Sequence, residues 1–391
     1  MVIPYGRQNI SSLDVDAVVD VLKSEYLTQG PVVPKFEFEV SNKCSASMAV
    51  ATSSATAALH VACLALGVGA GDRVWTSAIT FVASANCAVY CGAHVDFVDI
   101  DSKTYNMSIE HLEDKLKIAS RNGALPKVVI PVHLAGQSCD MAEIYSLSQR
   151  FGFRIIEDAS HALGGQYKGK PVGSCQFSDI TVFSFHPVKI ITTGEGGLAT
   201  TNDEILAKRM ALYRSHGITR DHDQMKMIPK GRWYYEQLEL GFNYRMTDIA
   251  AALGRSQLSR LDAFVLDRQK LVRNYNELFE GQPVTIPWQH PDSHSSHHLY
   301  IIRPDLRQLQ ISHAELFERL YSRGFTANLH YIPVYHHPFF ASRGYRRSEF
   351  PNAESYYTNA MSIPIFPGLS EVEQHQIVEA ILTPRGHQTL F

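Results

Sequence analysis

A lysine that follows a strand-like segment is the first candidate for chemistry in this sequence. Lys189 ends the run Phe183-Ser184-Phe185-His186-Pro187-Val188-Lys189 and precedes Gly194-Glu195-Gly196-Gly197. The predicted strand ends near Phe185, and open α/β sheets bind ligands at the edge where their strands end. An amine held among apolar and small residues loses solvation, so its pKa falls and it can attack a carbonyl group. The alternative is a surface lysine before a glycine turn.

The second candidate is a carboxylate at the end of another strand-like segment. Phe153-Arg154-Ile155-Ile156-Glu157-Asp158 ends in two acids and is followed by Ala159-Ser160-His161. An acid at this edge of the sheet can pair with the protonated ring nitrogen of a cofactor. A helix cap or a turn aspartate would have the same local sequence. Taken alone, Asp158 fits both interpretations.

Two further segments have the residue types of a site for a flat, phosphorylated ligand. Ala51-Thr52-Ser53-Ser54-Ala55-Thr56 follows a predicted strand and opens a predicted helix. Small hydroxyl residues and free backbone N–H groups at a helix start bind anions such as phosphate. Phe81 follows another predicted strand, where an aromatic ring can stack on a flat cofactor. The structural alternatives are a Ser/Thr helix cap for the first segment and a core position for Phe81.

The elements that must position these residues alternate along the first half of the chain. Short β-branched runs are followed by segments with helical spacing, which indicates an α/β domain with a mostly parallel sheet and helices on both faces. The predicted strands are Met48–Thr52, Arg73–Ser77, Val95–Ile100, Lys127–Val132, Arg154–Glu157, Ile180–Phe185 and Leu198–Thr201. The predicted helices are Ala55–Leu66, Phe81–Cys91, Ile109–Ile118 and Met141–Phe151.

The pattern changes after about Tyr244. Residues 246–279 have the apolar stripe of one long helix, and residues 282–298 have the Pro, Ser and His content of a loop. The elements predicted beyond are a strand at His298–Ile302, a helix at His313–Arg323, an extended segment at Phe325–Ile332 and helices at Asn352–Met361 and Ser370–Leu382. We therefore predict a large domain over residues 1–245, with an N-terminal arm over residues 1–35, and a smaller α+β domain over residues 246–391.

Composition and charge limit the class of protein. The 391 residues are 45% apolar, which allows a sizeable core, and 19% charged, which is too little for a disordered chain. A formal charge of −3 argues against a nucleic-acid partner. The apolar run Val61–Ala70 has about half the length of a membrane span, and the first ten residues have no signal-peptide core. We therefore expect a cytoplasmic protein with no membrane partner and with reduced cysteines.

Nearly the whole chain resembles the DegT/DnrJ/EryC1/StrS family of sugar aminotransferases. The motifs that carry the resemblance include Glu157-Asp158-Ala159, Phe183-Ser184-Phe185, Lys189, Gly194-Glu195-Gly196-Gly197, Ser215-His216-Gly217, Gly241-Phe242-Asn243-Tyr244-Arg245-Met246 and Pro364-Ile365-Phe366. The resemblance implies PLP fold type I, like that of aspartate aminotransferase, with pyridoxal 5′-phosphate as cofactor. One departure is Ile190, which stands where the family has proline and removes no reactive group.

The resemblance also implies a role for each site residue. Lys189 would hold the cofactor through its amine and later move a proton, and Asp158 would keep the ring nitrogen protonated. Phe81 would stack on the ring, and His161 would lie near the ring hydroxyl. The implied cofactor-binding set is Ser54, Ala55, Thr56, Phe81, Asp158, His161, Ser184, Lys189 and Asn243, of which Asn243 would reach the cofactor of the second subunit in a homodimer. The implied substrate contacts are Tyr5, Glu25, Tyr26, Leu27, Thr28, Ser54, Asn328, Leu329, His330 and Tyr331.

A finer resemblance is to the branch of the family that acts in pseudaminic acid biosynthesis. It is carried by Ile3-Pro4-Tyr5-Gly6, Leu27-Thr28-Gln29-Gly30-Pro31, Ser54-Ala55-Thr56 and Ser160-His161-Ala162-Leu163-Gly164. It implies ping-pong transfer of an amino group from L-glutamate to the 4-keto carbon of UDP-2-acetamido-2,6-dideoxy-β-L-arabino-hexos-4-ulose. The product would be UDP-4-amino-4,6-dideoxy-N-acetyl-β-L-altrosamine.

Three alternatives remain beside this interpretation. The acceptor can be another 4-keto-6-deoxy nucleotide sugar, UDP- or dTDP-linked, because a few pocket residues decide between them. A catalytically silent family member is disfavoured by the intact Lys189, Asp158 and Ser184. Dehydratases of the family carry histidine where this chain has Lys189, which disfavours that reaction.

Two polar segments have less specific patterns. His290, His294, His297 and His298 are irregularly spaced with no cysteine near, so we predict a solvated loop and no metal site. Residues 219–233 contain Lys226, Lys230 and Arg232, which would meet a pyrophosphate if the segment were a flap over the site. An ordinary solvated loop fits that segment equally well.

Overall fold

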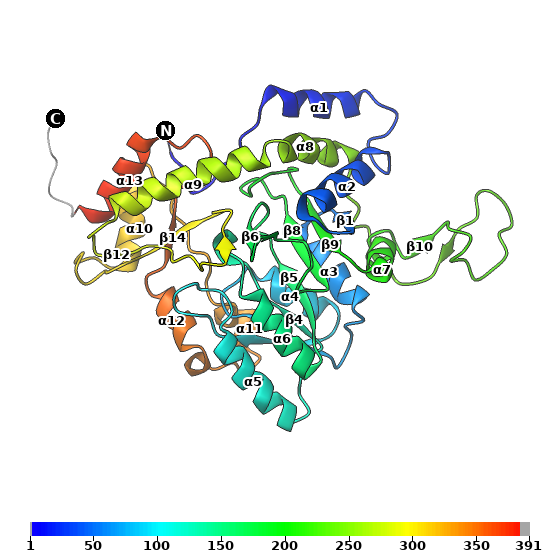
Figure 1. Ribbon diagram of the computed structural model, residues 1–391, viewed down its shortest axis with the longest axis horizontal. Helices are drawn as coiled ribbons and strands as arrows, with labels where there is room; N and C mark the ends of the chain where they lie inside the picture. Colours follow the sequence, from blue (N-terminus) through cyan, green and yellow to red (C-terminus); the bar gives the residue numbers. More distant parts are fainter. Residues whose placement is uncertain (1, 384–391) are drawn as a thin grey trace.

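A seven-stranded sheet lies at the centre of the computed structural model, which describes residues 2–383 (Figure 1). Its strands are β1 (Met48–Thr52), β2 (Arg73–Ser77), β3 (His94–Val98), β4 (Val128–Ile130), β5 (Arg154–Asp158), β8 (Ile180–Ser184) and β9 (Gly197–Thr201), in the order β1-β9-β8-β5-β4-β2-β3. The strands from β3 to β8 pair in parallel, whereas β9 pairs antiparallel with β1 and with β8. The predicted mostly parallel sheet is confirmed, with every predicted strand in place.

Alternating side chains along the strands bury helices against both faces of this sheet. Val74 and Ile156 pack with α3 and α4, whereas their chain neighbours Trp75 and Ile155 pack with α5 and α6. The helices of this part of the chain are α2 (Val32–Cys44), α3 (Ala55–Ala65), α4 (Ala83–Tyr90), α5 (Ile109–Arg121), α6 (Met141–Phe151), α7 (Glu204–Arg214) and α8 (Asp248–Leu258). The predicted α/β architecture with helices on both faces is therefore confirmed.

A second, smaller layer follows in the last third of the chain. Its sheet has the order β12-β14-β15, formed by β12 (Val284–Thr285), β14 (Tyr300–Pro304) and β15 (Met361–Ile363). Helices α9 (Leu261–Leu278), α10 (His313–Ser322) and α13 (Glu371–Leu382) enclose its core. The short elements η2 (Val334–His336), α11 (Pro338–Ala341), η3 (Arg347–Glu349) and α12 (Pro351–Tyr357) connect α10 to β15. The division of the chain at residue 245 stays a prediction, since α8 beyond it packs on α2.

The single long helix predicted over residues 246–279 is wrong, because the chain forms α8 and α9 with a break between them. Arg260 leaves helical geometry, with φ −104° and ψ 3°, and its guanidinium bonds the backbone oxygen of Asn9 and the carboxylate of Asp14. Figure 1 shows the two helices nearly end to end. The apolar stripe therefore continues across the break, which is why periodicity alone missed it.

The predicted N-terminal arm contains α1 (Ser12–Leu22) and the first residues of α2. Ser11 and Asp14 form a capping box at the start of α1. The buried Asp14 also accepts hydrogen bonds from Ser256 Oγ (2.6 Å) and Gln257 Nε2 (2.8 Å) of α8. These contacts, which span more than 240 residues of sequence, hold the arm on the body of the molecule.

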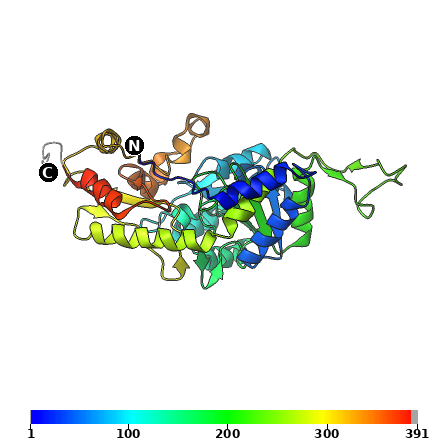
Figure 2. The same ribbon diagram turned by 90° about the horizontal axis from the view of Figure 1, so that it is seen from above.

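The two polar segments also differ from the sequence prediction in part. The segment 282–298 contains β12 and β13 (Ser293–His294), and its residues Ser296 and His298 are buried against the large domain. Residues 218–237 form a hairpin, with β10 (Ile218–Thr219) paired to β11 (Glu236–Gln237), that projects from the body (Figures 1 and 2). Over residues 2–383, no helix is long and apolar enough to cross a membrane. All six cysteines are free, and five of them are buried.

Candidate active site

Lys189 lies on a turn directly after β8. The turn is held by backbone hydrogen bonds from the N–H of Lys189 to the oxygen of His186 (2.9 Å) and from the N–H of Thr193 to the oxygen of Phe185 (3.0 Å). Burial lowers the pKa of the Lys189 amine to about 8, while the charge of Asp158 acts in the opposite direction. The amine is therefore deprotonated at far lower pH than an exposed lysine, as a nucleophile requires.

Asp158 is the last residue of β5 and is 4% exposed. Its Oδ2 accepts a hydrogen bond from Ser84 Oγ of α4 (2.6 Å), and Ser84 Oγ also lies 2.8 Å from Thr80 Oγ1. Its Oδ1 accepts from the N–H (3.1 Å) and the hydroxyl (2.5 Å) of Ser160. The hydrogen bond from the Ser160 N–H is the one a turn aspartate makes, as the structural alternative predicted. Asp158 is at the same time a buried carboxylate held by Ser84.

The start of α3 and the end of β8 meet at a cradle for an anion. Ser54 caps α3 by accepting the N–H of Ala57 (3.1 Å), which leaves the first N–H groups of the helix for a ligand. Gly197 of β9 pairs with both Thr52 and Ser184, and a Cβ at Gly197 would lie 2.3 Å from the backbone carbon of Ser54. Because only glycine fits there, the two ends approach closely and bring Ala55, Thr56 and Ser184 to one place.

His161 and Tyr331 form a third part of the site, although they are 170 residues apart in the sequence. Nε2 of His161 lies 2.9 Å from the hydroxyl of Tyr331, and their rings stack at 24°. The ring of Phe81 lies 6.0 Å from that of Tyr331 and is 56% exposed. Burial holds the pKa of His161 well below its usual range, and the charges of Lys189 and His330 act in the same direction.

The residues predicted to contact substrate fall into two groups. Tyr5, Asn328, Leu329 and His330 gather beside Tyr331: the Tyr5 and His330 rings are 5.1 Å apart, and His330 Nδ1 lies 2.8 Å from Ser362 Oγ. Burial lowers the pKa of His330 to about 3, with Lys189 adding to the effect. Asn328 forms a backbone bridge with Ser362 of β15, whereas Tyr331 reaches His161 of the loop after β5, so residues from both halves of the chain line the site.

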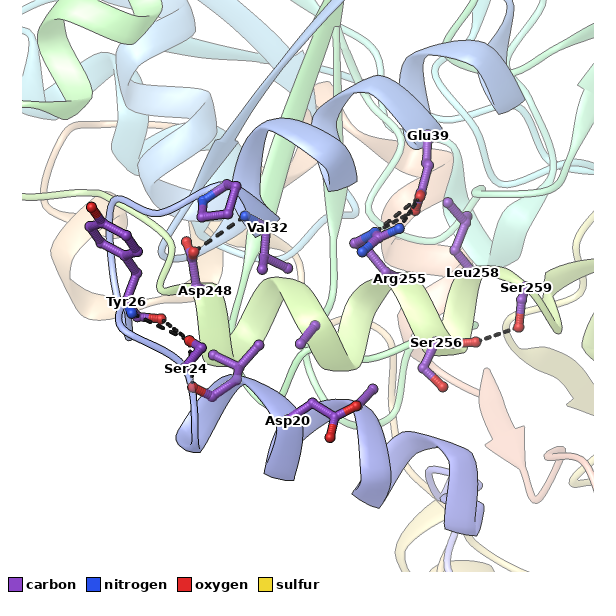
Figure 3. Close-up of a pocket in the computed structure, with 14 residues that line it drawn as sticks. Asp20, Ser24, Tyr26, Val32, Glu39, Asp248, Arg255, Ser256, Leu258 and Ser259 are labelled. Atoms are coloured by element: carbon purple, nitrogen blue, oxygen red, sulfur yellow. Dashed lines mark hydrogen bonds and ion pairs between the residues drawn. The ribbon is translucent and has the colours of Figure 1, made fainter.

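The second group lies elsewhere on this chain. Glu25, Tyr26, Leu27 and Thr28 are exposed, and Thr28 forms an isolated backbone bridge with Thr247. Figure 3 shows Tyr26 at one end of a cavity of about 720 Å³ between α1, α2 and α8, which also contains the ion pair of Arg255 with Glu39. Asn243 is exposed and bridges Ser215. Their predicted roles remain predictions.

Three site residues were missed by the sequence reasoning. Ser84 Oγ lies 2.8 Å from Thr80 Oγ1 and donates to Asp158, 74 residues along the chain, a contact that has no local sequence signal. His298, placed in a solvated loop by the sequence, is 3% exposed, and its ring lies 4.5 Å from that of His161. Ala135 donates its backbone N–H to His161 Nδ1 (3.2 Å), a contact that has no sequence signal.

These groups fit pyridoxal 5′-phosphate. The partly desolvated amine of Lys189 suits its aldehyde, the anchored carboxylate of Asp158 suits its ring nitrogen, and the glycine-lined cradle at Ser54 and Ser184 suits its phosphate. The exposed ring of Phe81 offers a face for stacking.

Comparisons with known proteins agree with this chemistry. Residues 8–382 match the DegT/DnrJ/EryC1/StrS aminotransferase family. The UDP-4-amino-4,6-dideoxy-N-acetyl-beta-L-altrosamine transaminase of Campylobacter jejuni is 38% identical over 93% of this chain and 92% of its own length. The spore coat polysaccharide biosynthesis protein SpsC of Bacillus subtilis is 36% identical over 97% of this chain and 96% of its own length.

Solved structures show the same fold and the cofactor. Helicobacter pylori PseC, an aminotransferase involved in pseudaminic acid biosynthesis, matches with a TM-score of 0.88 and 30% identity over 98% of both chains. A putative sugar aminotransferase from Streptococcus pneumoniae in its PLP form matches with a TM-score of 0.86 and 30% identity, also over 98% of both chains. The chain therefore belongs to the DegT/DnrJ/EryC1/StrS aminotransferase family and is a sugar aminotransferase that uses pyridoxal 5′-phosphate.

Proposed function

We propose that this aminotransferase moves the amino group of L-glutamate to the 4-keto carbon of UDP-2-acetamido-2,6-dideoxy-β-L-arabino-hexos-4-ulose. The product would be UDP-4-amino-4,6-dideoxy-N-acetyl-β-L-altrosamine. Support comes from the 38% identity to a transaminase named for this product and from the structural match to PseC. The motifs Ile3-Pro4-Tyr5-Gly6 and Ser160-His161-Ala162 point to the same branch.

The observation that carries the proposal is the pairing of a weakly basic Lys189 with the anchored Asp158. When bound, the cofactor supplies an electron sink for the carbanion that forms at the donor's α-carbon. A lysine with a pKa of about 8 both takes and releases protons near neutral pH, so Lys189 would move the proton between the donor and the reacting carbon. Asp158 would hold the proton on the ring nitrogen, since Ser84 and Ser160 fix its two oxygens.

The remaining residues would bind and orient. Ser54, Ala55, Thr56 and Ser184 would hold the phosphate at the cradle, and Phe81 would cover one face of the ring. Tyr5, Asn328, Leu329, His330 and Tyr331 would contact the sugar from the opposite wall.

A homodimer would complete the site. Asn243 is exposed, yet the next residue, Tyr244, accepts the N–H of Ser53 (2.7 Å) through its backbone oxygen. Asn243 thus lies on the surface beside the phosphate cradle, where a second subunit can be reached. The exposed segment of Glu25, Tyr26, Leu27 and Thr28 is likewise available to a neighbouring site.

The second candidate function is the same reaction on another 4-keto-6-deoxy nucleotide sugar, UDP- or dTDP-linked. It is favoured by the similarity to SpsC, which is named for spore coat polysaccharide biosynthesis and covers slightly more of the chain. The amine-transfer residues would be the same in both cases, so only the acceptor distinguishes the two.

Absorbance spectra of the purified protein loaded with pyridoxal phosphate test the proposal. We expect a yellow band that glutamate bleaches and that the UDP-linked L-arabino 4-keto sugar restores. Bleaching with restoration only by a dTDP-4-keto-6-deoxy sugar would establish the second candidate instead. A protein that takes up no pyridoxal phosphate, or whose band glutamate does not change, would refute the roles given to Lys189 and Asp158.

A further inference from the structure

The position of the proton on His161 follows from a backbone contact. A backbone N–H is always a donor, so His161 Nδ1, 3.2 Å from the nitrogen of Ala135, must be the acceptor. A neutral imidazole carries one proton, which is therefore on Nε2. A charged ring would place a second donor against the N–H of Ala135 and lose this bond.

The N–H of Ala135 is held in this direction by the surrounding chain. Ala135 has φ 60°, a left-handed conformation that is uncommon for a residue with a side chain. The segment around it is tied to residues 296–299: Ser296 donates its N–H to the oxygen of Gly136 (3.2 Å) and its hydroxyl to the oxygen of His161 (2.9 Å). Ser296 thus holds both the segment that carries the Ala135 donor and the backbone of His161, the acceptor.

His298 packs against the ring of His161. The two ring centroids are 4.5 Å apart at 49°, and Nδ1 of His298 is buried without a hydrogen-bond partner within residues 2–383. The ring is instead placed by its backbone, whose oxygen accepts from Nη1 of the buried Arg268 (3.1 Å). Nη1 of Arg268 also donates to the oxygens of His297 (3.2 Å) and Ile365 (3.1 Å). His298 therefore contacts His161 by packing.

Burial and the nearby charges also favour a neutral His161. Burial keeps the pKa of His298 and of His161 far below the usual range, and Lys189 and His330 lower both further. Arg268 adds to the effect on His298. Burial raises the pKa of Tyr331, and the charge of Asp158 acts likewise, so the phenol keeps its proton. These directions favour neutral rings for His161, His298 and His330 beside a protonated Tyr331.

We propose that Ala135 and His298 act as positioning residues that fix His161 with its proton on Nε2, which makes Tyr331 a hydrogen-bond donor to the bound ligand. With the proton on Nε2, His161 donates a hydrogen bond to the oxygen of Tyr331, 2.9 Å away. The O–H of Tyr331 is then free to donate to a third group. Within the described residues, His161 is the hydrogen-bond partner of this hydroxyl, so the third group is an acceptor oxygen of the ligand, such as the keto oxygen of the acceptor sugar. The contact of Tyr331 with the acceptor sugar rests on the proposed function, whereas the protonation state of His161 does not.

Nitrogen-15 NMR of the histidine rings in cofactor-free protein tests the state of His161 directly, with the His161→Gln variant assigning its signals. We expect Nε2 to be protonated and Nδ1 unprotonated from about pH 5 to pH 8. A proton on Nδ1, or titration near the ordinary pKa of about 6.5, would overturn the proposal.

Two substitutions separate the packing role of His298 from a general loss of structure. His298→Phe keeps an aromatic face and should preserve the His161 signals, whereas His298→Ala should raise the pKa of His161 toward its usual range by admitting water. His294→Ala, at an exposed position of the same segment, is the control and should change nothing. Unchanged His161 signals in His298→Ala, or lost ones in a folded His298→Phe, would refute the role of His298.

Tyr331→Phe tests the ligand contact. It should raise KM for the UDP-4-keto sugar by about tenfold, the effect of one lost hydrogen bond, while the cofactor band stays intact. An unchanged KM would refute the donor role of Tyr331. Failure to take up pyridoxal phosphate at all would refute the proposed function and leave the NMR result standing.

Discussion

Replacing Ser84 with alanine should slow amino transfer without abolishing it. Ser84 is fully buried on α4, and its hydroxyl donates to Asp158 Oδ2 at 2.6 Å. A hydrogen bond to a charged group contributes about 1.5–3 kcal/mol, and about 1.4 kcal/mol corresponds to a tenfold change in rate. Losing this bond, which holds the carboxylate that would face the ring nitrogen of the cofactor, should therefore slow the transfer by about 10- to 100-fold.

The remaining contacts of Asp158 limit the size of the loss. The N–H and the hydroxyl of Ser160 still hold its Oδ1, so the carboxylate stays anchored and the variant should keep measurable transfer. The assay is the rate at which glutamate bleaches the cofactor band of the loaded protein, measured as kcat/KM.

A second buried serine gives a matched control. Ser148 on α6 is 4% exposed, and its hydroxyl donates to the backbone oxygen of Tyr145 (2.7 Å), away from the site. Ser148→Ala should leave the rate of bleaching unchanged even if it lowers the melting temperature. If Ser84→Ala were bleached as fast as Ser148→Ala, the reasoning about the anchoring of Asp158 would be wrong.

Three further predictions concern the amine and the phosphate cradle. Lys189→Ala should take up pyridoxal phosphate without forming the yellow band and should lose transfer activity by several orders of magnitude; a retained band would show that another amine reacts. In cofactor-free protein, the rate of reaction with pyridoxal phosphate should rise with pH and level off above about 8, because the neutral amine is the nucleophile and burial lowers the pKa of Lys189 to about 8; half-maximal reaction near pH 10.5 would contradict this. Gly197→Ala should weaken cofactor binding at least about tenfold, measured by fluorescence titration, because its Cβ would lie 2.3 Å from Ser54. Gly69→Ala is the control, because a Cβ there meets nothing within 4 Å. Equal binding of pyridoxal phosphate by both variants would show that the cradle accommodates a Cβ at residue 197.

The local pattern of the chain was enough to predict much of the fold. The strands Met48–Thr52 and Arg73–Ser77 and the helix Met141–Phe151 have the predicted bounds, because strands with buried side chains and amphipathic helices carry their pattern within a few residues. The break between α8 and α9 could not be predicted from the local sequence. The chain leaves the helix at Arg260 to reach Asn9 and Asp14, partners about 250 residues away that no window of sequence contains.

The same distinction applies to the site. The sequence by itself determined the candidate reactive groups, since Lys189, Asp158 and Ser54 stand at strand ends or a helix start that are recognisable from their neighbours alone. Only the tertiary structure decided what surrounds them. Tyr331 meets His161 across 170 residues, and His298 leaves its polar segment to pack on the same ring. The physical reason is that periodicity is set by neighbours along the chain, whereas the pKa of a buried group and the direction of its hydrogen bonds are set by whatever the fold brings against it.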